Sequence, residues 1–408
     1  ERILAQLHNH EGWLRIRVGE FRKAESLLER SCSLYKRLGT PPPPYMGGAS
    51  EAPLALVAVI QGDLDRAVRL AKSARRASEQ REDRHNLAFA HYTLSAVKLA
   101  LGEFQVAQQH AQKSAVLARS LGNRWFLGYP LNEWGKAALA LGNRVEAKRQ
   151  FQASFAIKRD FNDAEGMAVA LNHLGEVAQL QGELSEAREA FERSLGIYRT
   201  LNDRGGLATS YRGLAKVALS LGELEDARKC FQQSLKIATD IHYLPLVFSL
   251  LVDVEPLLRQ QDHSALGVKL LSLVKQHPAS DHETMTRANR QLEQCERRMQ
   301  GQDFTEATRR GQAWKLEEAI AALRGPLSEP LSESKIAASI EQDLIEQLTA
   351  REQEVLALIA EGHSNAQIAE QLVLAVGTVK WYASQIYGKL GVTNRTEAAA
   401  RARELELL

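Results

Sequence analysis

Cysteine is rare in this chain, and its three copies, Cys32, Cys230 and Cys295, lie far apart in the sequence. None lies in a Cys-x-x-Cys or Cys-x-x-His pattern, which excludes a disulfide framework and favours a reducing compartment. Cys230 lies between alternating apolar positions of a helix-like segment, so a buried structural role is favoured over a thiol nucleophile. We therefore expect a cytoplasmic protein.

Long apolar runs are also missing. No stretch of about 18 apolar residues occurs, so we expect no transmembrane span and no membrane partner. The first residues, "ERILAQLHNHEGWLRIRVGEF", are charged and lack the apolar core of a signal peptide. The chain starts without methionine and in mid-pattern, so we expect a fragment or processed piece whose absent N-terminal part has room for another activity.

An excess of charge of one sign is absent as well. The formal net charge is +2 over 408 residues, so the whole chain has no general attraction for nucleic acid or membranes. Any such attraction has to be local.

The known catalytic motifs are not found. The sequence has no GxxxxGK[ST] phosphate loop, no HExxH, no GxSxG and no Cys/His metal spacing. The histidines are scattered, and His91 and His173 fall in helix-like segments where packing or surface roles are favoured over ligation. We expect no enzyme, no metal and no cofactor.

What the chain does have is a six-fold repeat. Six glycines are spaced by 43, 40, 40, 40 and 40 residues, and each is followed five residues later by alanine: Gly19, Gly62, Gly102, Gly142, Gly182 and Gly222, with Ala24, Ala67, Ala107, Ala147, Ala187 and Ala227. An apolar residue follows at nine and a small residue at twelve, as in Phe191 and Ser194. Internal periods of this length indicate a solenoid.

Each unit is predicted to be helix, turn, helix. The glycine ends one helix because it adopts the left-handed conformation cheaply, and the alanine and the small residue let neighbouring helices approach closely. This pattern resembles tetratricopeptide repeats in a longer-period variant, and the resemblance implies a superhelix whose concave face binds peptides, proteins or small effectors. The insertion Thr40 to Gly48 is interpreted as a rigid loop between repeats rather than a polyproline ligand.

The domain boundaries follow from where this pattern fades. We expect the repeat array at residues 1–245, degenerate capping helices at 246–325, a Ser- and Pro-rich linker at 326–343 and a different module at 344–408. Within the capping region, Gly311 to Gly325 is interpreted as one short helix.

The C-terminal module begins with two short capped helices. Thr349 with Glu352, and Ser364 with Gln367, have the spacing of capping boxes, and Gly362 is predicted to stop the first helix. A longer helix follows around residues 377–390, and a last one begins near Asn394. Two short helices and a longer third predict a helix-turn-helix.

The segments "LTAREQEVLALIAEG", "SNAQIAEQL", "TVK" and "IYGKLGVTNRTEAAARA" resemble, in order and spacing, the LuxR-type DNA-binding domain. The resemblance implies that the third helix of this domain lies in the major groove and that the fourth contributes to dimer contacts. With the repeats, the chain resembles the C-terminal part of large ATP-dependent LuxR regulators of the MalT type. The nucleotide-binding domain of those regulators is absent from these residues.

The stretch "GTVKWYASQIYGKLGV" can be tested separately on a helical wheel. Val379, Ala383, Ile386 and Leu390 point in one direction, with Tyr382 beside them. Trp381, Ser384, Gln385 and Gly388 lie opposite, and Lys380 lies next to them. This distribution predicts a helix with one buried face and one outward face that carries a tryptophan.

The resemblance assigns the DNA-contacting residues. Lys380, Trp381 and Ser384 match the groove-facing reader positions, and Thr378, Lys389 and Arg395 match positions that hold the phosphate backbone. The chain departs from the family at Ala375, where serine is frequent, at Tyr382, where histidine is frequent, and at Ser384, where a longer polar residue is frequent. Solvated helix charge is an equally favoured interpretation of Lys389 and Arg401.

The sequence therefore predicts an all-α protein, a tetratricopeptide-like α-solenoid followed by a four-helix LuxR-type domain. The favoured function is a bacterial transcription regulator that binds double-stranded DNA as a homodimer and receives a protein or small-molecule effector on the array. The alternative is an interaction scaffold whose C-terminal module serves docking or dimerisation.

Overall fold

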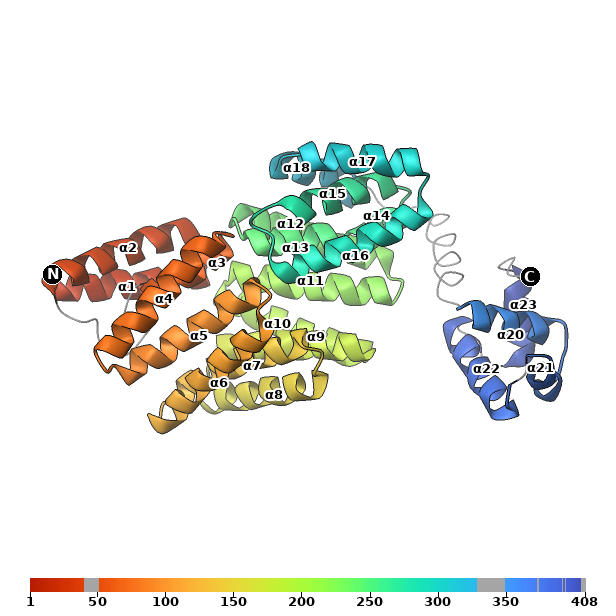
Figure 1. Ribbon diagram of the computed structural model, residues 1–408, viewed down its shortest axis with the longest axis horizontal. Helices are drawn as coiled ribbons and strands as arrows, with labels where there is room; N and C mark the ends of the chain where they lie inside the picture. The colour runs from red at the N-terminus through yellow and green to blue at the C-terminus, as the bar shows by residue number, and fades with distance from the viewer. Residues whose placement is uncertain (40–50, 329–348, 373, 391, 393, 405–408) are drawn as a thin grey trace. The chain divides into compact units, whose positions relative to one another are not determined.

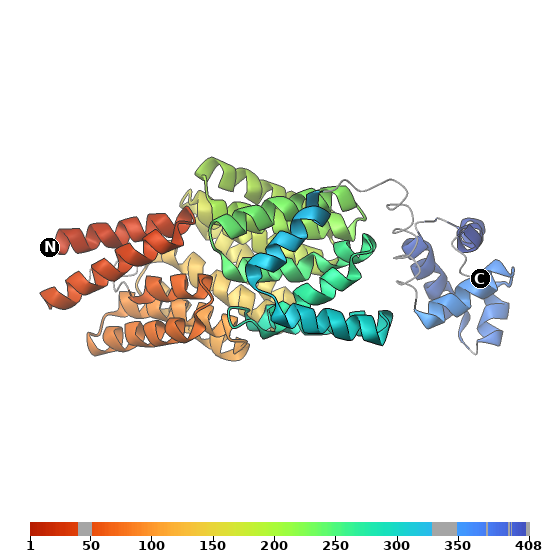
Figure 2. The same ribbon diagram turned by 90° about the horizontal axis from the view of Figure 1, so that it is seen from above.

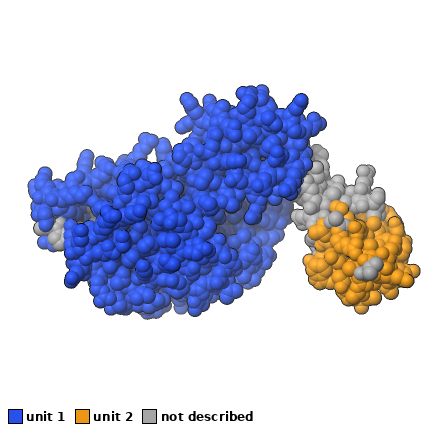
Figure 3. All heavy atoms as spheres, viewed as in Figure 1, with its two compact units in different colours: residues 1–329 blue, residues 330–408 orange. Residues whose placement is uncertain are grey.

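The computed structural model describes residues 1–39, 51–328, 349–372, 374–390, 392 and 394–404. All regular secondary structure in these residues is helical. The chain divides into two compact units, residues 1–329 and 330–408, which are coloured separately in Figure 3. The all-α expectation is confirmed.

The first unit consists of a long series of antiparallel helices (Figure 1). Their bounds are α1 Arg2–Arg17, α2 Phe21–Leu38, α3 Glu51–Ile60, α4 Leu64–Gln80, α5 Arg84–Ala100, α6 Phe104–Ser120, α7 Arg124–Ala140, α8 Arg144–Asp160, α9 Ala164–Gln181, α10 Leu184–Leu201, α11 Arg204–Ser220, α12 Leu224–Asp240, α13 Leu244–Asp253, α14 Glu255–Gln260, α15 Ser264–Gln276, α16 His282–Arg298, α17 Gly301–Ala313 and α18 Leu316–Ser328.

The repeat glycines and alanines have the roles that their spacing predicts. All six glycines have a positive φ, between 74° and 82°, and each separates two helices of one repeat. The alanine five residues later is fully buried in every repeat. Because both features recur at the same position, the predicted helix, turn, helix unit is confirmed.

The serine at position twelve of the repeat allows close packing and also forms a hydrogen bond. In five repeats its hydroxyl donates to the backbone carbonyl 26 residues earlier, over 2.7 to 3.1 Å: Ser31 to Ala5, Ser114 to Ala88, Ser154 to Gly128, Ser194 to Ala168 and Ser234 to Ala208. Ala74 replaces the serine in the remaining repeat. The buried hydroxyl thus ties the second helix of a repeat to the first.

The odd-numbered helices from α3 to α13 form the inner layer, because they contact one another across the repeats as well as their own partners. The array also curls back on itself. The ring of Phe21 lies 5.7 Å from that of Tyr243, and the ring of Phe104 lies 5.9 Å from that of His282. Helices α2 and α6 from the first half of the array therefore lie against the region of α13 and α16. Figure 2 gives a second view of the chain.

The helices after α12 cover the end of the array. The sequence predicts one helix from Gly311 to Gly325, but the chain breaks at Trp314 and Lys315, so α17 and α18 are separate. Helix α18 also continues through residues 326–328, which the sequence assigned to the linker. The remaining linker residues 329–343 and the predicted loop Thr40 to Gly48 lie outside the described residues.

The cysteines are not arranged for nucleophilic chemistry. Burial raises the pKa of Cys230 to about 11, although this side chain is half-buried rather than fully buried as expected. Cys295 is buried, and burial raises its pKa to about 12. At neutral pH both thiols are protonated and therefore poor nucleophiles. Among the described helices, none combines the length and apolar character needed to cross a bilayer.

The second unit is a small bundle with its own core. Its helices are α20 Ala350–Ala360, α21 Asn365–Gln371, α22 Val376–Leu390 and α23 Arg395–Glu404. Apolar residues from all four helices form one buried cluster, which includes Leu356, Ile368, Ile386 and Ala402. The predicted four-helix order is confirmed for this part of the chain.

Candidate nucleic-acid interface

Two capping boxes define the short helices of the second unit. The hydroxyl of Thr349 accepts from the backbone N–H of Glu352, whose carboxylate accepts in turn from the backbone N–H of Thr349 at 2.7 Å. Ser364 and Gln367 repeat this arrangement at the start of α21. Because both boxes fix where a helix begins, the sequence signal for them is confirmed.

Between these helices the chain makes a tight turn. Gly362 has a φ of 92° and ends α20, as the sequence predicts. Helix α21 ends at Gln371, and the backbone N–H of Leu374 returns to the carbonyl of Ala369 at 2.8 Å. The short second helix is thereby held against the start of α22.

Helix α22 has the two faces that the helical wheel predicts. Val379, Ala383, Ile386 and Leu390 are buried, with at most 5% of each residue exposed. Trp381 is 57% exposed, and its ring meets that of the half-buried Tyr382 at 5.0 Å in an edge-to-face contact. The tryptophan is therefore anchored at one edge while most of its surface is open to solvent.

The structure brings some of the predicted contact residues together. Thr378, Lys380 and Trp381 are all exposed near the start of α22, where Ala375 begins the helix through its backbone carbonyl. The side chains of Ser384 and Lys389 lie outside the described residues. The DNA-contacting roles of all these residues remain predictions.

Arg395 lies in a different setting. Its guanidinium donates to the carbonyls of Ile359, at 3.2 Å, and His363, so it caps the C-terminal end of α20. Arg403 reaches the neighbouring carbonyl of Ala360 at 3.2 Å, and Arg351 reaches that of Leu372 at 2.7 Å. The sequence reasoning missed this set of arginine caps, because charge alone does not separate a carbonyl partner from a phosphate partner.

We expect Arg395→Ala to destabilise the second unit. Hydrogen bonds from a charged donor to buried carbonyls contribute about 1.5–3 kcal/mol, and their loss would fray the end of α20. Hydrogen exchange on the full chain should show faster exchange for the amides of α20. Lys380→Ala, which removes an exposed cation from the same unit, is the control and should leave that exchange unchanged.

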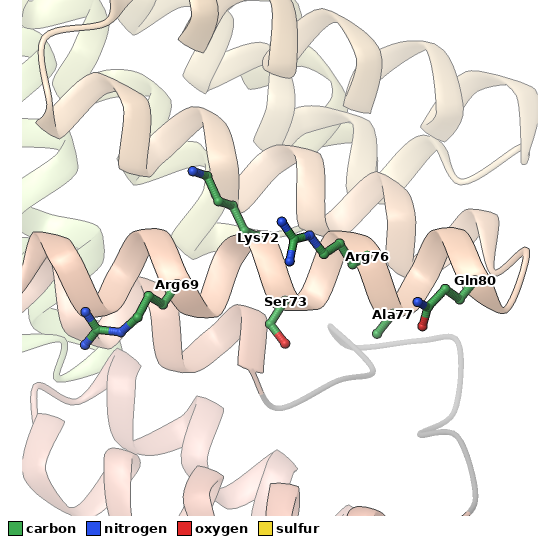
Figure 4. A pocket seen from close by; sticks show the side chains of 6 residues that line it. All are labelled: Arg69, Lys72, Ser73, Arg76, Ala77 and Gln80. Atoms are coloured by element: carbon green, nitrogen blue, oxygen red, sulfur yellow. The ribbon is translucent and has the colours of Figure 1, made fainter.

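A second concentration of positive charge lies on the array. Arg69, Lys72 and Arg76, with Ser73, Ala77 and Gln80, line a shallow hollow of about 340 Å³ on α4 (Figure 4). All of these residues come from one helix. Within the described part of the chain, none of the three cations forms an ion pair. Substitutions of these cations can therefore serve as controls for charge changes at other sites.

The described residues contain no group of three or more His, Cys, Asp or Glu side chains that could hold a metal ion. The histidines named from the sequence are instead engaged in packing. His91 meets His110 with 2.9 Å between their Nδ1 atoms, and His173 stacks on Phe151. Burial lowers the pKa of His91 to about 4, so its ring is neutral at physiological pH.

Two protein-family models match this chain. Residues 346–402 match the bacterial regulatory proteins of the luxR family, and residues 129–200 and 166–240 match the tetratricopeptide repeat. The chain therefore carries a luxR-type helix-turn-helix in its second unit and tetratricopeptide repeats in its first. Both resemblances found in the sequence are confirmed.

Two relatives with curated descriptions each match a short part of this chain. The chain is 41% identical to the probable transcriptional regulatory protein SgaR of Hyphomicrobium methylovorum over 85 residues. These residues make up 21% of this chain and 39% of that protein. The chain is 48% identical to the HTH-type transcriptional regulator MalT of Serratia proteamaculans (strain 568) over 58 residues. These residues make up 14% of this chain and 6% of that protein. The chain thus spans less than half the length of either relative.

The fold of the array has parallels among solved structures. The crystal structure of a Rap protein complexed with competence and sporulation factor is similar to 78% of this chain and 99% of that one, with a TM-score of 0.50 and 15% sequence identity. This likeness concerns the fold alone.

Proposed function

We propose that this chain is a DNA-binding transcription regulator in which the repeat array receives an effector or partner and the C-terminal helix-turn-helix binds promoter DNA. Helix α22 is the recognition helix and enters the major groove with Lys380 and Trp381 facing the bases, together with Ser384. Thr378 and Lys389 hold the phosphate backbone. Arg395 contributes by fixing the end of α20, and any phosphate contact it makes is additional.

The observation that carries the proposal is the outward face of α22. Trp381 has 57% of its surface exposed, and an exposed lysine precedes it on a helix that is anchored by four buried residues. An apolar ring suits the thymine methyl or the sugar, and a lysine suits a phosphate or a guanine edge. The luxR-family match covers this same helix.

The finer features follow from the same proposal. The protein acts in the cytoplasm, binds its site as a homodimer and has no catalytic activity of its own. An effector on the array changes DNA affinity, which requires that it bind the DNA-competent and incompetent states with different affinity.

We expect Lys380→Glu to abolish most sequence-specific binding. Replacing a cation at the DNA surface by an anion costs one favourable contact and adds a repulsion, together about 2–3 kcal/mol, which is roughly 30- to 150-fold in Kd. After in vitro selection of a binding site with the full chain, fluorescence anisotropy at several salt concentrations measures Kd. The slope of log Kd against log salt should also fall by about one unit.

Lys72→Glu on α4 is the matched control, because it makes the same charge change on the array. It should leave the Kd unchanged. The absence of salt-dependent DNA binding by the unmodified chain would instead favour the scaffold alternative, in which the C-terminal module serves docking or dimerisation.

A further inference from the structure

Three successive inner helices carry ionisable residues in register. Lys136 on α7, Glu176 on α9 and Lys216 on α11 occupy the same position of the repeat, each 40 residues from the next. The ammonium of Lys136 pairs with Glu133 at 2.6 Å, and the carboxylate of Glu176 meets His173 at 3.0 Å. Two members of the row therefore have a local partner.

Lys216 is different. Among the described residues no carboxylate lies at ion-pairing distance from its ammonium, although the side chain is half-buried. Burial lowers the pKa of Lys216, and the positive charges of Arg212 and Arg287 act in the same direction, while the attraction of Asp253 and Glu176 acts against them without outweighing burial. The amine is thus buried without a carboxylate in contact, and more distant acids compensate its charge only in part.

The neighbouring carboxylate already pairs with two arginines. Arg212, one turn before Lys216 on α11, donates from Nε to Oδ2 of Asp253 at 2.5 Å. Arg287 on α16 donates from Nη2 to Oδ1 of the same carboxylate, also at 2.5 Å. Asp253, on α13, is 8% exposed, so each of its oxygens is occupied by one arginine in a buried position.

At contact distance this cluster has more cations than carboxylates. Asp253 pairs with Arg212 and Arg287, while among the described residues no carboxylate contacts the ammonium of Lys216. Burial raises the pKa of Asp253, but Arg212, Arg287 and Lys216 outweigh burial and hold that pKa at about 2. Glu176 and Glu283 attract Arg212 from further away, and Glu176 also attracts Lys216, so more distant acids offset part of the positive charge.

The two arginines remain reachable from solvent. The side chain of Arg287 is 26% exposed and that of Arg212 is 14% exposed, and each guanidinium has N–H groups beyond the one that meets Asp253. Charged donors in a recessed, poorly hydrated setting bind an oxyanion more strongly than the same donors on an open surface. The open cations of α4 are a contrasting case, since all of them come from one exposed helix face.

We propose that Arg212, Lys216 and Arg287 form an anion-binding site on the inner layer of the array, for a small effector with a carboxylate or phosphate group. This inference rests on the proposed function for its biological meaning, since it names the chemical class of the effector. The two arginines are fixed by Asp253 and present preset donors, while Lys216 supplies a charge that, among the described residues, no carboxylate contacts.

The test uses the full chain and two probes, inorganic phosphate and citrate. Each is titrated into the millimolar range at constant ionic strength with chloride as the balancing anion, because exposed charges respond to salt in general. We expect a saturable rise of the thermal midpoint with one probe or both, since a ligand that binds only the folded state stabilises it. Phosphate alone would assign a phosphorylated effector, and citrate alone a carboxylate.

The variants separate the site from other cations. Lys216→Gln should weaken the apparent affinity at least tenfold, which corresponds to the loss of one charged contact, and Lys216→Arg should restore it. Lys136→Gln, at the equivalent position but already paired, and Lys72→Gln on α4 should keep the affinity of the unmodified chain. Without probe, Lys216→Gln should not lower the thermal midpoint, because burial of this charge outweighs the attraction of the carboxylates around it.

Two results would overturn the site: no saturable effect of either probe on the unmodified chain, or equal affinity in Lys216→Gln. Loss of the folded state in Lys216→Gln while Lys216→Arg is folded but does not bind would also overturn it, because the lysine would then be structural. DNA affinity without probe is measured on the same variants. Failure of every variant and of the unmodified chain to bind DNA refutes the regulator proposal, while the anion titration still decides the site.

Discussion

Trp381→Ala is expected to reduce the affinity for the selected DNA site by about 2 kcal/mol, roughly thirtyfold in Kd, while the stability of the fold is nearly unchanged. The large loss is expected because, in the proposed complex, a central aromatic side chain loses its contact with the DNA surface. The small effect on stability follows because 57% of Trp381 is exposed in the free protein. Fluorescence anisotropy measures the first quantity and thermal unfolding the second.

The adjacent residue gives a matched control. Tyr382 is half-buried and packs against the core of the second unit, and its ring contacts that of Trp381. Tyr382→Ala should therefore lower the free energy of unfolding by about 2 kcal/mol through lost packing. If Trp381→Ala unfolds the second unit instead, the tryptophan belongs to the core and the two faces of α22 are assigned the wrong way round.

The repeat architecture could be predicted because it depends on backbone conformation and close packing at fixed intervals. A glycine at each turn and an alanine five residues later are visible in one sequence, and both have the structural role that the spacing predicts. The hydrogen bond from Ser194 to Ala168 could not be read in the same way. At a crowded position, serine is compatible with two roles: a small side chain that allows close packing, or a hydroxyl that donates a hydrogen bond. Only the position of the facing carbonyl shows which role applies.

In the second unit, the pattern of charges in the sequence did not predict which groups the arginines contact. The helical wheel separated the buried and outward faces of α22 because burial follows helical periodicity. It could not tell that Arg395 reaches the end of α20, since that contact joins residues 32 and 36 apart in sequence. The same applies to Arg212 and Arg287, which meet on Asp253 only after three helices have packed.

Another contact of this kind lies between α8 and α9. The ammonium of Lys158 is completely buried, 3.5 Å from the ring centre of Tyr129, and it pairs with Asp163 at 2.9 Å. Two glycines leave room for this side chain: a Cβ on Gly166 would lie 2.5 Å from its Cδ, and a Cβ on Gly128 would lie 2.6 Å from its Cε. The carboxylate of Asp163 also caps α9 by accepting from the backbone N–H of Gly166 at 3.0 Å.

Asp163→Ala should therefore lower the free energy of unfolding of the array by about 4 kcal/mol. Loss of the cap accounts for about 1 kcal/mol, and the buried cation left without a partner accounts for about 3 kcal/mol or more. Burial already lowers the pKa of Lys158 in the intact protein. Without Asp163 this pKa falls further, so the unfolded state binds more protons than the folded state, and the stability of the variant should rise as the pH increases towards the unfolded value of about 10.4.

Asp163→Asn separates the two contributions, because asparagine is a competent cap in this chain: Asn123 and Asn143 cap α7 and α8 through their side-chain oxygens. Asp163→Asn should keep the cap and lose only the charge, and adding Lys158→Met should recover most of that loss, since no unpaired charge then remains buried. Urea unfolding of the four proteins at pH 7 and pH 9 measures both effects. If Asp163→Asn and Asp163→Ala are equally mild and show no dependence on pH, the ion pair contributes little and Lys158 is held mainly by its aromatic contacts and its packing between the two glycines.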